Sequence, residues 1–220
     1  MTILSKNDQK GRSMVEMLGV LAIIGVLSVG GISGYSKAMG KFKLTKAQDQ
    51  ISMLLMNIRT AFATSSSYKG LHNGTAINFG IAPSDMTRTS KYTSSILTST
   101  ANLVHAFGGA ARVGTCADSK VNMGCNRGLL ADSGMANDQF FIIRFEDLTS
   151  ENCFALAGVD WGAEGFAGIN VNDVEGEEDG GEGEGETVGL YNPTNYPISM
   201  FQLSKACKGG TGNSVSWTFY

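Results

Sequence analysis

An apolar run constrains the fold of this chain most strongly, since residues 17–36 contain no charged side chain. About 20 apolar residues in a helix suffice to cross the hydrocarbon core of a bilayer. Glu16 stands directly before this run. An ionised carboxylate at the edge of a spanning helix costs about a few kcal/mol on insertion, so it indicates a functional site with a partner. The sequence therefore predicts a membrane helix whose first turn carries a functional acid.

A partner for Glu16 is suggested by the residues that precede it, Lys10, Gly11 and Arg12. Cleavage after Gly11 would give Arg12 a new α-amino group, and Glu16 would then lie about one helical turn away. In surroundings of low dielectric constant, Glu16 is tolerated only as a paired charge. Pairing with such an α-amine of another chain would fix the register between the two chains, which is the best-attested use of a buried ion pair.

The segment from Lys10 to Glu16, followed by the apolar run, resembles the N-terminus of type IV pilins and of the pseudopilins of type II secretion systems. The resemblance covers about the first 60 residues, and the chain length is similar to the type IVb group. It implies a leader that a prepilin peptidase removes after Gly11, N-methylation of Arg12, and an assembly role for Glu16. The new first residue in that family is most often Phe or Met, so Arg12 departs from the pattern.

The function implied by the resemblance is that of a structural subunit of a type IV pilus filament. The precursor would lie in the inner membrane, and the assembled filament would be extracellular, at the cell surface. Its partners would be further copies of itself, the prepilin peptidase and the inner-membrane assembly machinery. A minor pilin or a type II secretion pseudopilin is the alternative within the family. A membrane-anchored extracytoplasmic binding domain is the alternative of another class.

A cleaved secretory signal peptide is a further alternative, with Lys6 and Lys10 as its basic region and residues 17–29 as its apolar core. Glu16 would interrupt that core, and no pair of small residues is well placed for cleavage after it. An amphipathic helix pattern also continues directly beyond the run. These features favour the pilin-type segment.

One long helix is expected over residues 13–63. Four glycines lie near its middle, Gly30, Gly31, Gly34 and Gly40. They predict either local melting of the helix or close packing against other helices. The expected division is a leader (1–11), an apolar assembly helix (12–36), an amphipathic continuation (37–63) and a head domain (64–220). Apolar residues at helical spacing mark one face of the continuation: Leu44, Ala47, Ile51, Leu54, Ile58 and Phe62.

The head domain is expected to be α+β, with the long helix packed on a small antiparallel sheet, as in the pilin fold. Residues 140–145 are dense in aromatic and β-branched side chains and predict a buried strand. Residues 153–159 are expected to form its neighbour. Residues 215–220 alternate apolar and polar side chains, which predicts a strand with one buried face. Residues 94–107 predict a short helix.

Four cysteines, all in the expected extracytoplasmic part, indicate two disulfides. They allow three connectivities. We favour Cys116 with Cys125, which closes a local loop, and Cys153 with Cys207, which ties the C-terminal segment to the sheet. The resemblance implies a disulfide at this second place. A metal site is disfavoured, because the cysteines lack paired C-x-x-C spacing and a nearby histidine.

The residues from 173 to 186 are almost entirely Glu, Gly and Asp. Such composition predicts a solvated surface loop. A weaker hypothesis is calcium binding, which hard oxygen ligands on a flexible backbone would suit. Its ligands would be Asn170, Asn172, Asp173 and Glu175, and no other cofactor is expected.

No catalytic constellation is visible in the sequence, so we do not expect an enzyme. His72 and His105 have no evident partners and are expected to be surface or packing residues. The net charge of −3 offers no basic footprint for a nucleic-acid partner.

Overall fold

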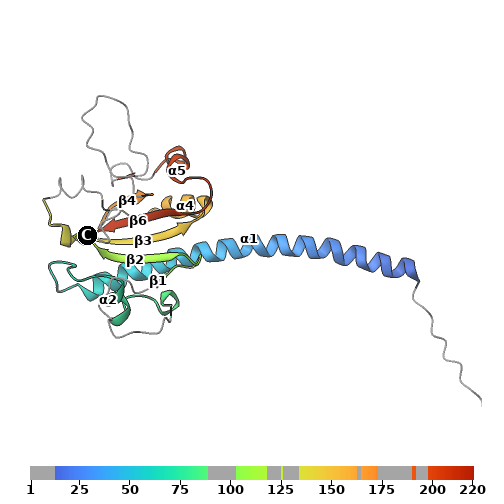
Figure 1. Ribbon diagram of the computed structural model, residues 1–220, viewed down its shortest axis with the longest axis horizontal. Coiled ribbons are helices and arrows are strands. Elements are labelled where there is room, and N and C mark those ends of the chain that lie inside the picture. The colour runs from blue at the N-terminus through green and yellow to red at the C-terminus, as the bar shows by residue number, and fades with distance from the viewer. Residues whose placement is uncertain are drawn as a thin grey trace, which may run out of the picture. The chain divides into compact units, whose positions relative to one another are not determined.

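The computed structural model describes residues 13–88, 103–117, 125, 134–162, 165–172, 190–191 and 198–220. These residues form helices, short 3-10 helices (η) and strands (Figure 1). In chain order they are α1 (Met14–Ala61), α2 (Asn73–Asn78), η1 (Ser84–Met86), β1 (Leu103–Val104), β2 (Ala110–Thr115), η2 (Asn137–Gln139), β3 (Phe141–Leu148), α4 (Ser150–Ala157), β4 (Phe166–Val171), β5 (Leu190–Tyr191), α5 (Met200–Ala206) and β6 (Asn213–Phe219).

Helix α1 runs unbroken from Met14 to Ala61, close to the bounds expected from the sequence. By its internal contacts the chain divides into two units, Met1–Phe42 and Lys43–Tyr220. Each unit is described by itself below. The second, which contains the last part of α1 and all the strands, is called the head.

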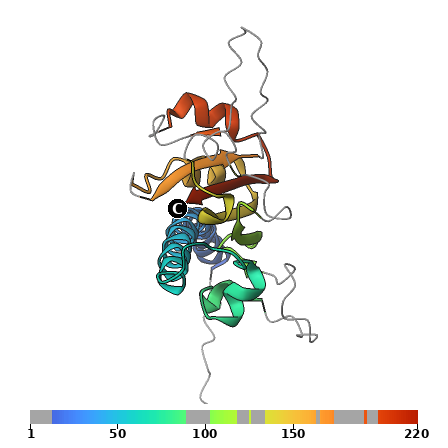
Figure 2. The ribbon, with the colours of Figure 1, turned by 90° about the vertical axis from the view of Figure 1, so that its left-hand side faces the viewer.

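The head contains one six-stranded sheet in the order β1-β2-β3-β6-β4-β5. Every neighbouring pair of strands is antiparallel. The last part of α1 lies along one face of this sheet (Figure 2). The α+β class expected from the sequence, a long N-terminal helix on a small antiparallel sheet, is therefore confirmed.

The expected apolar face of α1 forms the core of the head. Ala47, Ile51, Leu54 and Ile58 are fully buried and pack with the apolar face of β3 and β6, where Trp217 is also buried. Leu44 and Phe62, at the ends of the same face, are partly buried against this core. Spacings of three and four residues place these side chains on one side of a helix, which explains why the pattern predicted the contact.

A buried glutamine joins α1 to two other segments of the head. Gln50 is 2% exposed, and its Nε2 donates a hydrogen bond to Asp85 Oδ2 at 2.9 Å. Its Oε1 accepts one from the Ala106 backbone N at 2.9 Å. Lys46 adds an ion pair to the same Asp85 oxygen at 3.0 Å. The amide groups of Gln50 are thereby satisfied, as burial requires.

Both strongly patterned strands are present, and one differs from its prediction. Of the predicted strand 140–145, residues 141–145 fall in β3, as expected. The alternating residues 215–219 fall in β6, but all seven residues of β6 are buried rather than one face. β6 lies between β3 and β4, and a second apolar cluster, which includes Ile142 and Ala167, covers the far side of the sheet. Sequence alternation alone does not reveal that a central strand is covered twice.

The prediction of a strand at residues 153–159 is wrong, because Ser150–Ala157 forms α4. Thr149 caps this helix by accepting a hydrogen bond from the Asn152 N at 3.2 Å. Cys153, Leu156 and Ala157 are its buried residues. Their separations of three and one residues fit a helical stripe, and the short apolar run alone did not distinguish helix from strand.

The prediction of a helix at residues 94–107 is wrong in the part that the structure describes. Leu103 and Val104 form β1, which pairs with Ala110 and Ala111 of β2. His105 begins the turn between them, and its backbone N donates to Gly109 O at 3.1 Å. The glycine pair at 108–109 closes a hairpin instead of ending a helix. Residues 94–102 lie outside the described residues.

Candidate functional site

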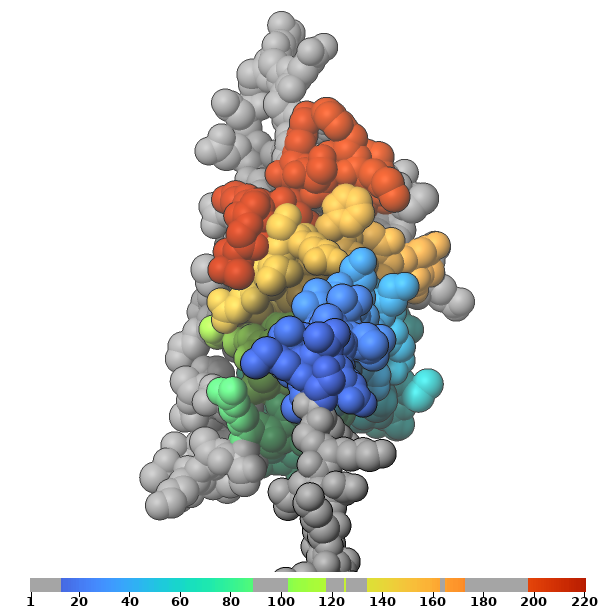
Figure 3. Space-filling model, turned by 90° about the vertical axis from the view of Figure 1, so that its right-hand side faces the viewer, coloured from blue at the N-terminus to red at the C-terminus, as the bar shows by residue number. Residues whose placement is uncertain are grey.

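The first half of α1 presents an apolar surface with one acid. Met14, Val15, Leu18 and most other large apolar side chains of this half are exposed. Glu16 is the sole charged residue between Met14 and Ser36. These side chains form the blue surface in Figure 3. An apolar surface of this extent is not left to water in a folded protein, so it marks a contact with lipid or with other chains.

Glu16 lies in the first turn of α1. Its backbone N donates to Ser13 O at 2.9 Å. The unsatisfied N–H groups at a helix N-terminus favour a carboxylate there. An amine supplied by another chain would complete the charge pairing that an apolar environment requires.

α1 is long and apolar enough to cross a membrane, with a mean hydropathy of 2.2 over its most apolar window. A Cβ added at Gly30, Gly31, Gly34 or Gly40 would meet no atom of the described residues within 4 Å. Contacts among these residues therefore do not require the glycines, and the helix is unbroken across them. Both interpretations, melting and close packing between chains, stay predictions.

Two disulfides are present, and they join the pairs favoured from the sequence. Cys116 pairs with Cys125, nine residues apart. Cys153 of α4 pairs with Cys207 at the end of α5, 54 residues apart. Cys153 and Cys207 are both nearly fully buried. The second bond holds the C-terminal α5 against the helix that follows β3.

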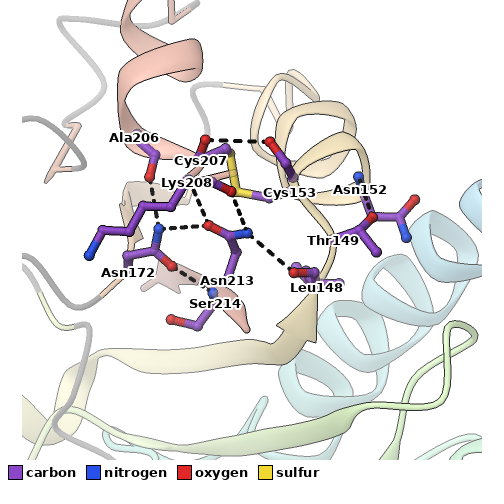
Figure 4. The surroundings of a disulfide bond; sticks show 11 residues. Leu148, Thr149, Asn152, Cys153, Asn172, Ala206, Cys207, Lys208, Asn213 and Ser214 are labelled. Atoms are coloured by element: carbon purple, nitrogen blue, oxygen red, sulfur yellow. Dashed lines mark hydrogen bonds between the residues drawn. A yellow bond between two sulfur atoms is a disulfide. The ribbon is translucent and has the colours of Figure 1, made fainter. Parts of the chain in front are cut away.

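A polar network surrounds the Cys153–Cys207 disulfide (Figure 4). At its centre Asn213 is 2% exposed. Asn213 Oδ1 accepts hydrogen bonds from Lys208 N at 2.8 Å and from Asn172 Nδ2 at 2.9 Å. Asn213 Nδ2 donates to Lys208 O at 3.0 Å and to Leu148 O at 3.3 Å. Because every polar atom of the amide is bonded, the network fixes the loop that leads into β6.

One of the four hypothetical calcium ligands, Asn172, takes part in this hydrogen-bond network. Asn172 Nδ2 donates to Ala206 O at 2.8 Å, and its Oδ1 accepts from Ser214 N at 2.9 Å. Asn170 is buried in β4. Asp173 and Glu175 lie outside the described residues, so the set stays a prediction. Among the residues described, no group of three His, Cys, Asp or Glu side chains is placed to hold a metal ion.

Other site residues stand as follows. Gly11 and Arg12, the expected cleavage pair, lie outside the described residues, as does the acidic run 173–186. His72 caps α2, since its Nδ1 accepts from Thr75 N at 3.2 Å. His105 is buried and bonded on both ring nitrogens. Both histidines therefore have partners that the sequence did not reveal.

Gln50 and Asn213 organise hydrogen bonds between separate segments of the head, a role that was not predicted from the sequence. A polar residue inside an otherwise apolar helical stripe is a signal for Gln50. A glycine-rich turn directly before a strand is a signal for Asn213.

Comparison with known proteins supplies the family. Residues 42–220 match the family described as PilS N terminal. The chain belongs to the PilS N-terminal family. This match begins beyond the apolar run, so the N-terminal motif and the family match are separate observations. Together they confirm the resemblance to type IV pilins.

Two solved pilin structures are similar to this PilS-family chain. One is a type IVb pilin from Salmonella typhi, with 16% sequence identity and a TM-score of 0.48, covering 80% of this chain and 97% of that one. The other is TcpA, a type IV pilin from Vibrio cholerae El Tor biotype, with 12% identity and a TM-score of 0.44, covering 81% and 99%. No curated protein sequence matches the chain.

Proposed function

We propose that this chain is a structural subunit of a type IV pilus filament, rather than an enzyme. Prepilin peptidase would cut after Gly11, and the mature chain would polymerise through α1. The observation that carries the proposal is Glu16, the single charged side chain of an otherwise apolar helix surface that is exposed among the residues described. Family membership supports the pilin part of the proposal independently.

In the precursor, α1 would anchor the chain in the inner membrane, and the disulfide-containing head would lie outside the cytoplasm. The domains would be the leader 1–11, the assembly helix 12–36, its continuation 37–63 and the globular, disulfide-containing domain 64–220, which is the part of the head that follows α1. Extraction into the filament would exchange lipid contacts of α1 for contacts with other copies. The inner-membrane assembly machinery would drive this exchange, which would leave the filament at the cell surface.

Cohesion and register come from different groups in this scheme. Packing of apolar α1 surfaces would supply the cohesion, because dispersion contacts accumulate along a helix. Glu16 would pair with the α-amine of Arg12 in a neighbouring subunit and select one axial register. A buried ion pair adds little net stability, but removing one partner leaves an uncompensated charge at a cost of roughly 3–5 kcal/mol.

The alternatives predict different behaviour. A minor pilin or pseudopilin would use the same motif at the tip of a filament or in a secretion system, and would be scarce in sheared material. A membrane-anchored extracytoplasmic binding domain would never polymerise and has no use for Glu16.

The test is Glu16→Leu compared with Glu151→Leu, a matched control that removes an exposed acid of α4. Filaments sheared from cells would be quantified, together with the protein left in the inner membrane. We expect Glu16→Leu to accumulate in the membrane, with its disulfides formed, and to be absent from the sheared fraction. The control should assemble normally. Normal assembly of Glu16→Leu would refute the role of Glu16.

A further inference from the structure

A group of lysines begins where the apolar run of α1 ends. Lys37 is the first charged residue after the run, and the charges that follow it are also lysines, Lys41, Lys43 and Lys46. The first acid after the run is Asp49. The apolar run is therefore followed directly by a segment that carries only positive charge.

This positive charge lies on the unusual side of the apolar run. In the proposed precursor the head is outside the cytoplasm, so the lysines that follow the run would lie outside it too. Lysine and arginine are normally concentrated on the cytoplasmic side of a membrane helix. A cluster of lysines on the opposite side therefore indicates a partner of negative charge at that surface.

The geometry of α1 places two of these lysines at the level of the lipid headgroups. Residues 17–36 rise about 30 Å, at about 1.5 Å per residue, which matches the thickness of the hydrocarbon core. Lys37 is the next residue, and Lys41 lies about 6 Å further along the axis. Side chains on a helix lean toward its N-terminus, so Lys41 leans back toward the membrane. Both ammonium groups can therefore reach lipid phosphates.

Lys37 and Lys41 are also available to bind a partner. Both are exposed, and a separation of four residues places them on the same side of α1. No ion pair joins either of them to another residue that the structure describes, whereas Lys46 is paired with Asp85 at 3.0 Å. Two ammonium groups on one side of the helix thus lack a counterion within the described part of the chain.

Tyr35 supports the same placement of the membrane surface. It is 66% exposed and stands one residue before the end of the apolar run. Tyrosine is enriched at membrane–water interfaces, because its ring is apolar and its hydroxyl is polar. This level of α1 therefore carries both the aromatic and the basic side chains that anchor a helix at an interface.

We propose that Lys37 and Lys41 bind the phosphate groups of anionic phospholipids at the outer face of the inner membrane. A zwitterionic lipid carries its own cation beside the phosphate, so a headgroup with net negative charge is the better partner for lysine. This binding rests on the proposed anchoring of the precursor through α1, and it would fix the depth of the helix in the bilayer. Extraction into the filament would then break these contacts.

The test is electron paramagnetic resonance of spin-labelled lipids in phosphatidylcholine vesicles that contain the full chain. The fractions of labelled phosphatidylglycerol and phosphatidylcholine that the protein immobilises give their relative affinity. We expect a preference for phosphatidylglycerol of about fivefold, the effect of one basic residue near an anionic surface, and a smaller one in about 1 M salt. Equal immobilisation would overturn the lipid site and leave the anchor standing. Immobilisation of neither lipid would overturn both.

Paired variants assign the preference to these lysines. Lys37→Gln with Lys41→Gln removes both charges, whereas Lys69→Gln with Lys205→Gln removes two exposed charges of the head. The leader is the same in every chain, so the difference between the variants reports on residues 37 and 41. We expect the first pair to lower the preference about fivefold and the second to leave it unchanged. Lys37→Arg with Lys41→Arg should keep it, because the charge is retained. An equal preference in both glutamine pairs would overturn the proposal.

Discussion

His105 links the β1–β2 hairpin to β3 through its ring. Nε2 lies 2.7 Å from Glu146 O and so donates to it, while Nδ1 accepts from Phe107 N at 3.2 Å. The ring stacks on Phe145 with 4.8 Å between centroids. This bonding pattern needs the neutral ring, because a protonated Nδ1 would face a donor.

Stability should fall in acid because of His105. Burial lowers its pKa, although the bond to Glu146 O and the charges of Asp147 and Glu146 oppose the shift. As the pH falls, His105 therefore takes up a proton in the unfolded chain before it does so in the folded one. The stability that neutral His105 contributes is complete above pH ~6.5 and is lost as the pH falls below that value. We expect a smaller loss of unfolding free energy between pH 7.5 and 5.5 in His105→Gln than in the native chain. Chemical denaturation measures this, with His72→Gln as the control, and an unchanged loss in His105→Gln would contradict the assignment.

Gly109 permits close contact between the hairpin and β3. A Cβ there would overlap Glu146 O and His105 Nε2. Overpacking of this kind costs typically about 1–3 kcal/mol, so Gly109→Ala should lower the free energy of unfolding by that amount. Gly209→Ala is the matched control, since its Cβ would meet nothing within 4 Å. Equal stability of the two variants would show that the contact is not tight.

At the scale of elements, helical periodicity predicted α1, alternation predicted β6 as a strand, and a dense run of aromatic and β-branched residues predicted β3. Each of these signals extends over a stretch long enough to decide the type of element. α4 and β1 were missed because each contains only a few apolar residues. The local signals for these elements were Thr149, which caps α4, and the glycine pair 108–109, which forms the turn between β1 and β2. Pairing with β2 then made residues 103–104 a strand.

The two disulfides should differ in their effect on stability. Cys153–Cys207 closes a loop of 54 residues and Cys116–Cys125 one of nine. In the chain-entropy model these loops correspond to about 4 and about 2.5 kcal/mol. Replacing both cysteines of each pair by alanine should therefore destabilise the chain more at 153 and 207, as measured by denaturant unfolding without reductant. The reverse order would indicate that the loop-closure argument does not apply here.

At the scale of the whole molecule, the assembly motif could be predicted from sequence and the polar network around Asn213 could not. Glu16 and its apolar run are contiguous, so their chemistry is visible without a fold. The network brings together Leu148, Asn172 and Asn213, which belong to three separate segments. Only the sheet order and the Cys153–Cys207 bond place them side by side, and no local pattern records that proximity.

The most direct test of the central claim is intact mass and N-terminal sequencing of protein sheared from cell surfaces. It examines cleavage, export and assembly in one sample. A filament subunit should be recovered in high-molecular-weight material as a chain that begins at Arg12, with or without N-methylation. A chain that keeps residues 1–11 and stays in the membrane, with nothing in the sheared fraction, would contradict the account and favour an anchored domain.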